Sequence, residues 1–445
     1  MIIEKSSYQY DSGNDGWIVT FILYPNHNMS TITLSQFGDL MKKVIEPVIQ
    51  DQIFRETILL NKLQINKNVK LANGTFYITA LTGRHSGVYN VAEGDNIDDG
   101  SFKTAQMNVK AKYLYGRHTF TDIALEGIEG DAGSIANLLT TATEELKDSI
   151  QRAFQRQFSS YGRGVLGTVK TGVTGTTITL TARDQTDFGY GTINVTEGQK
   201  ILIGTEAQVK AGTADAVTVV AVVSDTQITV DSSITVVAGD VVVNQKIRDS
   251  TNSVYTEMSG MRNLLDTTAT GAIDGIVPDT NFQGIARATN NFTNAFVYKP
   301  AAYETLTIER MNEYYLKARK YGKPDLIRVN ADLYAKYGAL LVQNKRFVNT
   351  MQLEGGFEGL EFAGGANPVP VVLDYDADEA SVEILDMATF TYGEMAPIGF
   401  VDRDGMVLRN VGGNSANFTA IMRAYGELIC LKPRGNARLT GIKVA

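Results

Sequence analysis

The sequence predicts an α+β fold in which one very long helix and one very long β-hairpin accompany a separate all-β insertion. Three stretches lead to this prediction. Residues 131–161 repeat apolar side chains every three or four positions, as an amphipathic helix does. Residues 84–118 place strand-like arms around an acidic tip, as a hairpin does. Residues 166–248 are rich in Thr, Val, Gly and Asp, and the 445 residues leave room for two or three domains.

The beginning of the chain predicts an arm. Residues 1–28 are either an accessory arm or an upstream extension, because Met29 opens a more ordinary N-terminal sequence, and both alternatives stay open. Residues 29–60 follow as an N-terminal arm. Their apolar pattern from Leu34 to about Arg55 fits an amphipathic helix, which Pro47 is expected to kink.

The hairpin over residues 84–118 raises a problem of burial. Its tip is acidic and turn-forming, and a two-stranded ribbon alone in water is marginally stable at best. Its apolar side chains therefore need a surface from elsewhere. The residues expected to contact a neighbouring subunit are Tyr89, Val91, Glu93, Asp95, Asp98, Asp99, Met107 and Val109.

The helix over residues 131–161 is the strongest in the sequence. At 1.5 Å per residue it spans about 45 Å, whereas an ordinary helix is about a third as long. It is read either as a long bundle helix or as a strut between subunits. The residues that mark it are Ile135, Leu139, Leu146, Ile150, Arg152 and Phe154.

The insertion contains a weak internal echo. The same order of strand, turn and strand occurs twice. The first copy has strands at Ile178–Leu180 and Ile201–Ile203, and the second has strands at Ile228–Val230 and Val241–Val243. Short strands separated by Gly and Asp predict a small barrel or sandwich. We expect this unit to fold autonomously.

Mixed α/β character returns in the last part of the chain. The pattern predicts a helix that begins near Ile308 and ends near Tyr321–Gly322, a strand at Leu326–Val329 and a helix at Ala331–Gln343. Residues 369–385 read as a strand, an acidic turn and a strand. Residues 418–431 predict a long strand with one apolar face, formed by Phe418, Ala420, Met422, Ala424, Leu428 and Cys430.

Charge and cysteine content restrict the function. A net charge of -8 disfavours a free-standing sequence-specific DNA-binding protein, which usually has a basic face. The single cysteine, Cys430, excludes an intrachain disulfide framework and is expected to fill core space. The basic residues Lys432, Arg434, Arg438 and Lys443 are expected to form a solvated face rather than a nucleic-acid contact.

Candidate sites for chemistry are weak. His85 and His118 flank the hairpin but lack an obvious third metal ligand, so ordinary surface histidines are favoured. The string from Asp374 to Asp378 begins like a calcium loop, but Glu379 and Leu385 stand where that loop requires Gly and Glu. We therefore expect a solvated acidic turn. No catalytic, cofactor-binding or metal-binding residue is assigned, no cofactor is expected, and an enzyme is not predicted.

The order of the parts resembles the major capsid proteins of tailed bacteriophages, which share the Hong Kong 97-type fold. The stretches that carry the resemblance are GRHTFTDIALEG (residues 116–127), QRAFQRQFSSYG (151–162), PDLIRVNADLYAKYGALL (324–341) and NPVPVVLDYDADEASVEILDMATF (367–390). The resemblance implies a spine helix at 131–161 and an extended hairpin at 84–118. It implies a peripheral domain formed by 61–165 and 400–445, an inserted β-domain at 166–248 and an axial domain at 249–399.

The resemblance also implies a function. The expected protein is a structural subunit of an icosahedral phage head that assembles in the host cytoplasm into a procapsid and encloses double-stranded DNA. Its expected partners are copies of itself in pentamers and hexamers, a scaffolding protein, a portal and decoration proteins, without a membrane. Two alternatives remain: the shell of an encapsulin-type compartment, and a β-rich adhesin or tail component.

Overall fold

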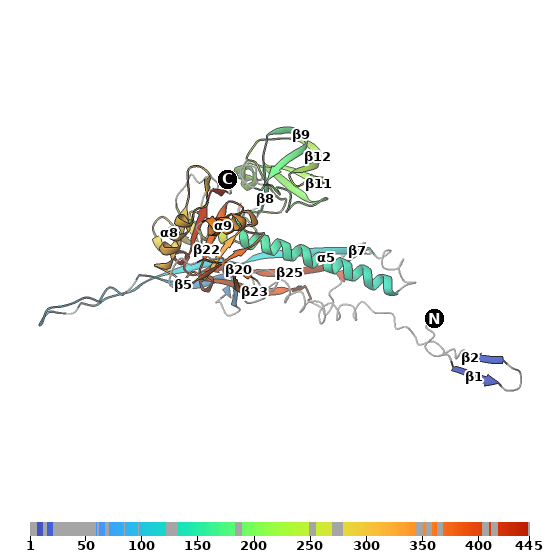
Figure 1. Ribbon diagram of the computed structural model, residues 1–445, viewed down its shortest axis with the longest axis horizontal. Coiled ribbons are helices and arrows are strands. Elements are labelled where there is room, and N and C mark those ends of the chain that lie inside the picture. The colour runs from blue at the N-terminus through green and yellow to red at the C-terminus, as the bar shows by residue number, and fades with distance from the viewer. Residues whose placement is uncertain are drawn as a thin grey trace.

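The computed structural model describes most of the chain, and one long ribbon projects from its body (Figure 1). The predicted arm helix and Met29 lie outside the described residues. Near the N-terminus, β1 (Ser7–Asp11) and β2 (Gly16–Thr20) pair as an antiparallel hairpin. The described residues are 7–11, 16–20, 59, 62–66, 71–83, 85–96, 98–121, 132–182, 189–248, 255–268, 279–343, 350–352, 358–362, 368–402, 409–410 and 417–443.

The predicted long helix is confirmed as α5 (Ala132–Ser159), with 28 residues. Its buried face carries Ile150, Phe154 and Phe158, which join a core shared with the sheet beneath the helix. Gly116 lies on that sheet, and a Cβ atom there would come within 2.7 Å of the Ile150 side chain. The missing side chain at Gly116 therefore lets the helix lie close to the strand. The side chains of Ile135 and Leu139 are outside the described residues.

The sheet under α5 is built around β25 (Asn417–Cys430), which confirms the predicted long strand. Most of the expected apolar face is buried against the helix core, from Ala420 to Cys430 at every second residue except Gly426, whereas Phe418 is only half-buried. On one side β25 pairs with β7 (Lys112–Thr121), from Gly426 opposite Lys112 to Asn417 opposite Thr121. On the other side lie β23 (Phe390–Phe400), β24 (Arg409–Asn410) and, beyond β23, β3 (Gln64–Asn66). Among the described residues, no strand pairs with the outer edge of β7.

A second sheet has seven strands and supports two predicted helices. The helices α8 (Ile308–Arg319) and α9 (Ala331–Gln343) are confirmed, as is the strand β18 (Leu326–Val329). β18 lies between the two strands of the 369–385 segment, so those strands do not pair with each other. The sheet order is β16 (Phe296–Tyr298), β26 (Ala437–Thr440), β22 (Ser381–Leu385), β18, β21 (Val369–Leu373), β20 (Glu358–Phe362) and β19 (Thr350–Gln352).

Membership of the two sheets differs from the predicted domain boundaries at two places. β23 was expected in the axial domain but pairs with β25, whereas β26 was expected in the peripheral domain but pairs with β16 and β22. The chain therefore crosses between the sheets twice near its end. Strand pairing between distant segments decides this, and the local pattern of apolar residues does not report it.

The prediction of a solvated acidic turn is wrong at Asp374. This carboxylate lies 2.7 Å from the guanidinium of Arg328, which also contacts Glu383 at 2.8 Å. Arg328 is 1% exposed. A buried charge needs a partner of opposite sign, so the turn folds inward to supply one.

The prediction of a solvated basic face near the C-terminus is wrong at Arg438, which is fully buried. It lies on β26, in the interior of the seven-stranded sheet, and its guanidinium donates to the hydroxyl of Tyr161 at 2.9 Å. Arg434 is also engaged, because it donates to the carbonyl of Asn291 at 3.0 Å. The two arginines therefore connect the end of the chain to Tyr161 and to Asn291.

The inserted segment forms a closed six-stranded barrel, one of the two predicted shapes. The sequence pattern missed the helix α6 (Glu206–Ala211), which begins in a capping box at Thr205, and two of the six strands, at Val165–Val169 and Asp215–Ser224. The barrel has a core of its own, filled mainly by Val, Ile and Leu. Its strands, in order around the barrel, are β10 (Lys200–Gly204), β11 (Asp215–Ser224), β12 (Gln227–Val236), β9 (Val173–Thr181), β8 (Val165–Val169) and β13 (Val241–Asn244).

Removal of residues 167–246 is expected to leave the rest of the chain soluble and folded. Val165 lies opposite Val243 on paired strands, and paired strands are about 4.8 Å apart, so the two cut ends already lie side by side. Size-exclusion chromatography and circular dichroism check this outcome. A control deletion of equal length, 175–254, leaves the barrel strand β8 without either of its partner strands and is expected to aggregate. Loss of all soluble protein from the first deletion would show that the barrel belongs to the main core.

Candidate assembly interface

A hairpin forms as predicted and continues as a projecting ribbon, but its bounds differ from 84–118, because residues 112–118 belong to β7 and pair with β25. β5 (Thr75–Gly83) pairs with β6 (Lys103–Lys110) and, at its other edge, with β4 (Leu71–Ala72). Between β5 and β6, residues 85–102 run outward from the body; we call this segment the extended loop, and it is described except at Ile97 (Figure 1). Its arms stay together through Ser86, whose N–H donates to the carbonyl of Ser101 at 3.1 Å.

Two facing glycines make the extended loop narrow. A Cβ atom on Gly100 would lie 2.0 Å from the backbone nitrogen of Gly87, and one on Gly87 would lie 2.7 Å from that of Gly100. Nearer the tip, the hydroxyl of Tyr89 accepts a hydrogen bond from the N–H of Asp98. The two arms of the loop therefore contact each other through their backbones and through the Tyr89 side chain, and among its described residues no apolar core lies between them.

The surface of the extended loop is apolar along its arms and acidic at its tip. Val88 is 84% exposed and Phe102 is 62% exposed, while Tyr89 and Val91 are also exposed. The acidic residues expected to contact a neighbour are all exposed, namely Glu93, Asp95, Asp98 and Asp99. Exposing apolar surface costs about 25 cal/mol per Å². A loop of this kind gains free energy when another surface covers it.

The expectation of an inter-subunit role does not hold for Met107 and Val109. Met107 is completely buried against the core beneath α5, and Val109 packs with Phe76 and Ile429. The reason is that β6 runs back into the body of the molecule, so only the part of the hairpin beyond Lys103 projects. Sequence alternation alone could not show where the ribbon leaves the body.

The end of α5 ties several parts of the chain together. Arg152 donates to the carbonyl of Ile193 in the barrel at 3.1 Å, and Arg156 pairs with Glu257. One turn later, the hydroxyl of Ser159 accepts a hydrogen bond from Arg328 in the seven-stranded sheet. The predicted helix residues thus serve contacts within this chain: Leu146, Ile150 and Phe154 pack in its core, and Arg152 holds the barrel.

A buried polar cluster follows directly after α5, and no pattern in the sequence predicts it. Tyr161 donates to the carboxylate of Asp266 at 3.1 Å, and Lys299 lies 2.9 Å from the same carboxylate. Arg287 donates to the backbone carbonyl of Asp266 at 2.9 Å. These residues come from separate segments, so no spacing rule brings them together.

The remaining candidate residues are placed as follows. Cys430 is buried, which confirms the core interpretation, and burial raises the pKa of its thiol to about 12. His85 accepts a hydrogen bond from the N–H of Gly87 within the extended loop, whereas His118 lies on β7 opposite Ala420. In the part of the chain that the structure describes, no group of three or more His, Cys, Asp or Glu residues could hold a metal ion. No described helix is long and apolar enough to cross a membrane.

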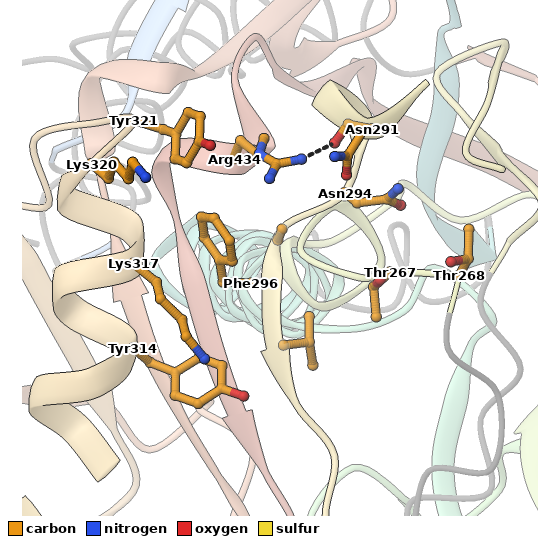
Figure 2. A pocket seen from close by; sticks show the side chains of 12 residues that line it. Thr267, Thr268, Asn291, Asn294, Phe296, Tyr314, Lys317, Lys320, Tyr321 and Arg434 are labelled. Carbon is orange, nitrogen blue, oxygen red and sulfur yellow. Dashed lines mark hydrogen bonds between the residues drawn. The ribbon is translucent and has the colours of Figure 1, made fainter. Parts of the chain in front are cut away.

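A pocket of about 500 Å³ lies beside α8 and the turn at Pro433–Gly435 (Figure 2). The guanidinium of Arg434 lies 4.7 Å from the ring centre of Tyr321 and 5.2 Å from that of Phe296. Lys317 lies 4.2 Å from the ring centre of Tyr314. Both cations are therefore already held over aromatic faces of this chain.

No protein-family model matches the chain, and no curated protein matches it. Among solved structures, the chain is similar to the Cyanophage A-1(L) capsid asymmetric unit, with 12% identity over 87% of this chain and 93% of that chain and a TM-score of 0.49. The Satellite phage P4 procapsid including size determination (Sid) protein gives 9% identity, 90% and 91% coverage and a TM-score of 0.39. The holo-SrpI encapsulin complex from Synechococcus elongatus PCC 7942 is 10% identical, over 87% of this chain and 88% of that chain, with a TM-score of 0.39.

The first two are described as phage capsid structures and the third as an encapsulin complex. The α+β architecture predicted from the sequence resemblance is present here, with a long helix on a long sheet, an extended loop, a second sheet with helices and an inserted barrel.

Proposed function

We propose that this protein is the structural subunit of an icosahedral phage head, without catalytic activity, which self-assembles into a procapsid and encloses double-stranded DNA. The observation that supports the proposal is the extended loop, which leaves the body with Val88 and Phe102 exposed and an acidic tip. At about 3.3 Å per residue, the tip reaches about 35 Å beyond the base of the hairpin. A neighbouring copy supplies the surface that the loop lacks.

Head-to-tail contacts of this kind produce rings. When the loop of one copy binds a different surface on the next copy, the contact repeats until a rotation closes it. Pentamers and hexamers are the rings that an icosahedral shell needs. The body of each subunit is suited to bear load in such a ring, because the end of α5 is bonded to the barrel and to the seven-stranded sheet.

The charge of the chain is consistent with DNA as the content of the shell. Phosphate contacts by Lys and Arg dominate non-specific DNA affinity, and strong adhesion to the wall would hinder movement of the genome. A net charge of -8 limits such adhesion. A scaffolding protein and a portal would complete the assembly, and attached decoration proteins would reinforce it.

The purified chain is expected to form shells or rings, with and without a co-expressed scaffolding protein, in negative-stain electron microscopy. Replacing Val88 and Phe102 by Ser is expected to reduce particle yield by at least about tenfold, because each exposed apolar side chain contributes about 1–3 kcal/mol when covered. Light scattering after chromatography measures the particle fraction.

The matched control replaces Val220 and Val223 by Ser. These two valines are exposed on the barrel to a similar degree, 55% and 59%, but lie away from the extended loop. The control is expected to assemble like the unaltered chain. A monodisperse monomer under all conditions would contradict the proposal, and enzyme cargo in place of DNA inside native particles would assign the shell to an encapsulin-type compartment.

A further inference from the structure

A second groove lies between β7, α5 and the barrel, and we call it the β7 groove. Its volume is about 880 Å³, near the upper end of what proteins use to hold a ligand. Six consecutive residues, 110–115, line it along one strand, and residues 244–248 and 255–257 line it from the barrel side. Six cationic side chains gather there, namely Lys110, Lys112, Arg156, Lys200, Lys246 and Arg248.

Most of this positive charge is not neutralised within the described part of the chain. The only carboxylate in the lining, Glu257, pairs with Arg156. Lys112 donates to the carbonyl of Tyr255 at 2.5 Å and interacts electrostatically with the buried carboxyl of Glu427, so the charge available in the groove comes from its other lysines. Lys110, Lys200 and Lys246 are exposed. In a chain of net charge -8, a groove of this sign is suited to an acidic partner.

The backbone of the groove is also suited to a polypeptide. Residues 112–115 belong to β7, whose outer edge pairs with no described strand. An open edge of this kind presents a row of N–H and C=O groups to which an extended segment can add as a further strand. Tyr113 and Tyr115 are both exposed on β7, but their rings pack against Tyr425 of β25, so the outer edge offers mainly its backbone groups.

The extended loop carries the complementary features. Its tip presents Glu93, Asp95, Asp98 and Asp99, and its arms present exposed Val88 and Val91 in an extended conformation. No ion pair joins these four carboxylates to any described residue of the same chain. Figure 1 shows the loop running away from the barrel, so the groove and the loop of one copy point to different neighbours.

We propose that the β7 groove receives the tip of the extended loop of a neighbouring copy. This inference rests on the proposed function and names the receiving surface. The tip carboxylates meet Lys110, Lys200 and Lys246, and the arm beside the tip lies along the edge of β7. The inserted barrel, which supplies one wall of the groove, thereby becomes part of the contact between subunits.

Cysteine pairs test the contact directly. The chain with Asp95→Cys and Lys246→Cys is expected to give a ladder of disulfide-linked oligomers on non-reducing gels after mild oxidation of assembled particles. Each copy then has one cysteine in its loop and one in its groove, so it can form a disulfide with a neighbour on either side. The matched control joins Asp95→Cys with Lys317→Cys, which places the second thiol in the other cationic pocket (Figure 2). That control is expected to stay monomeric on the gel.

Charge reversal provides an independent readout. Lys200→Glu with Lys246→Glu is expected to reduce particle yield by roughly tenfold or more. Adding Asp95→Lys and Asp98→Lys to the same chain is expected to restore assembly, because the pairing of opposite charges returns. A general folding defect would not be rescued by changes in the loop.

The outcomes separate this inference from the proposed function. Particles that form while the ladder appears only with Lys317→Cys, or with neither pair, overturn the inference and leave the shell function intact. Groove variants that assemble normally but retain less DNA assign the groove to nucleic acid and also overturn it. If the unaltered chain forms no particles, the proposed function fails and the inference fails with it.

Discussion

Arg328→Met is expected to lower the free energy of unfolding by about 3–5 kcal/mol. The guanidinium of Arg328 lies between Asp374 at 2.7 Å and Glu383 at 2.8 Å, and it also donates to Ser159 at the end of α5. Methionine fills most of the space but leaves two carboxylates in the interior without a cation. Urea denaturation of the unassembled chain, followed by circular dichroism, measures the loss.

Two companion variants show whether charge is the cause. Lys317→Met removes a cation whose pair with Glu313 is exposed, and it is expected to cost less than about 1 kcal/mol. Combining Arg328→Met with Asp374→Asn and Glu383→Gln is expected to recover much of the stability, because no uncompensated charge then remains. A loss below about 1 kcal/mol for Arg328→Met alone would contradict this account.

The stability of the chain is expected to fall as pH rises from about 5 to about 8, because of Glu427. Burial raises the pKa of this carboxyl to about 8, although Lys112 and the N–H groups of Ser259 and Leu428 act in the opposite direction. In the unfolded chain the pKa is about 4.3. Between these values the folded state binds more protons than the unfolded state, so stability decreases with pH, and the total change is on the order of 3 kcal/mol.

Glu427→Gln is expected to remove this slope. The variant should match the unaltered chain at pH 5 and exceed it at pH 8.5, since the amide never has to ionise in the interior. Glu309→Gln, at an exposed position in the first turn of α8, is the control and should leave the pH profile unchanged. Parallel profiles for Glu427→Gln and the unaltered chain would show that this carboxyl does not govern the effect.

The elements that sequence predicted well are those in which burial repeats with a period. α5, α8, α9 and β25 each bury one face, and their apolar positions recur every three or four residues in the helices and every two in the strand. The hairpin was found by its acidic, glycine-containing tip. Its outer part remains exposed, which agrees with the expectation that its own chain does not cover it.

The parts that sequence did not predict depend on contacts between distant segments. Arg328 and Asp374 are separated by 46 positions, and Arg438 meets Tyr161 across 277. No local pattern distinguishes a charged residue that will be buried with a partner from one that stays in water. The β7 groove has the same property, since a strand, a helix and the barrel each supply a wall.

The bonds at the end of α5 have a mechanical consequence. Within about two turns, the helix contacts the barrel through Arg152, residue Glu257 through Arg156, and the seven-stranded sheet through Ser159. Because these three contacts hold the C-terminal end of α5 to different parts of the chain, we expect this region to be rigid. In the proposed shell, a force that a neighbouring copy applies to one of these parts is therefore transmitted through α5 to the others.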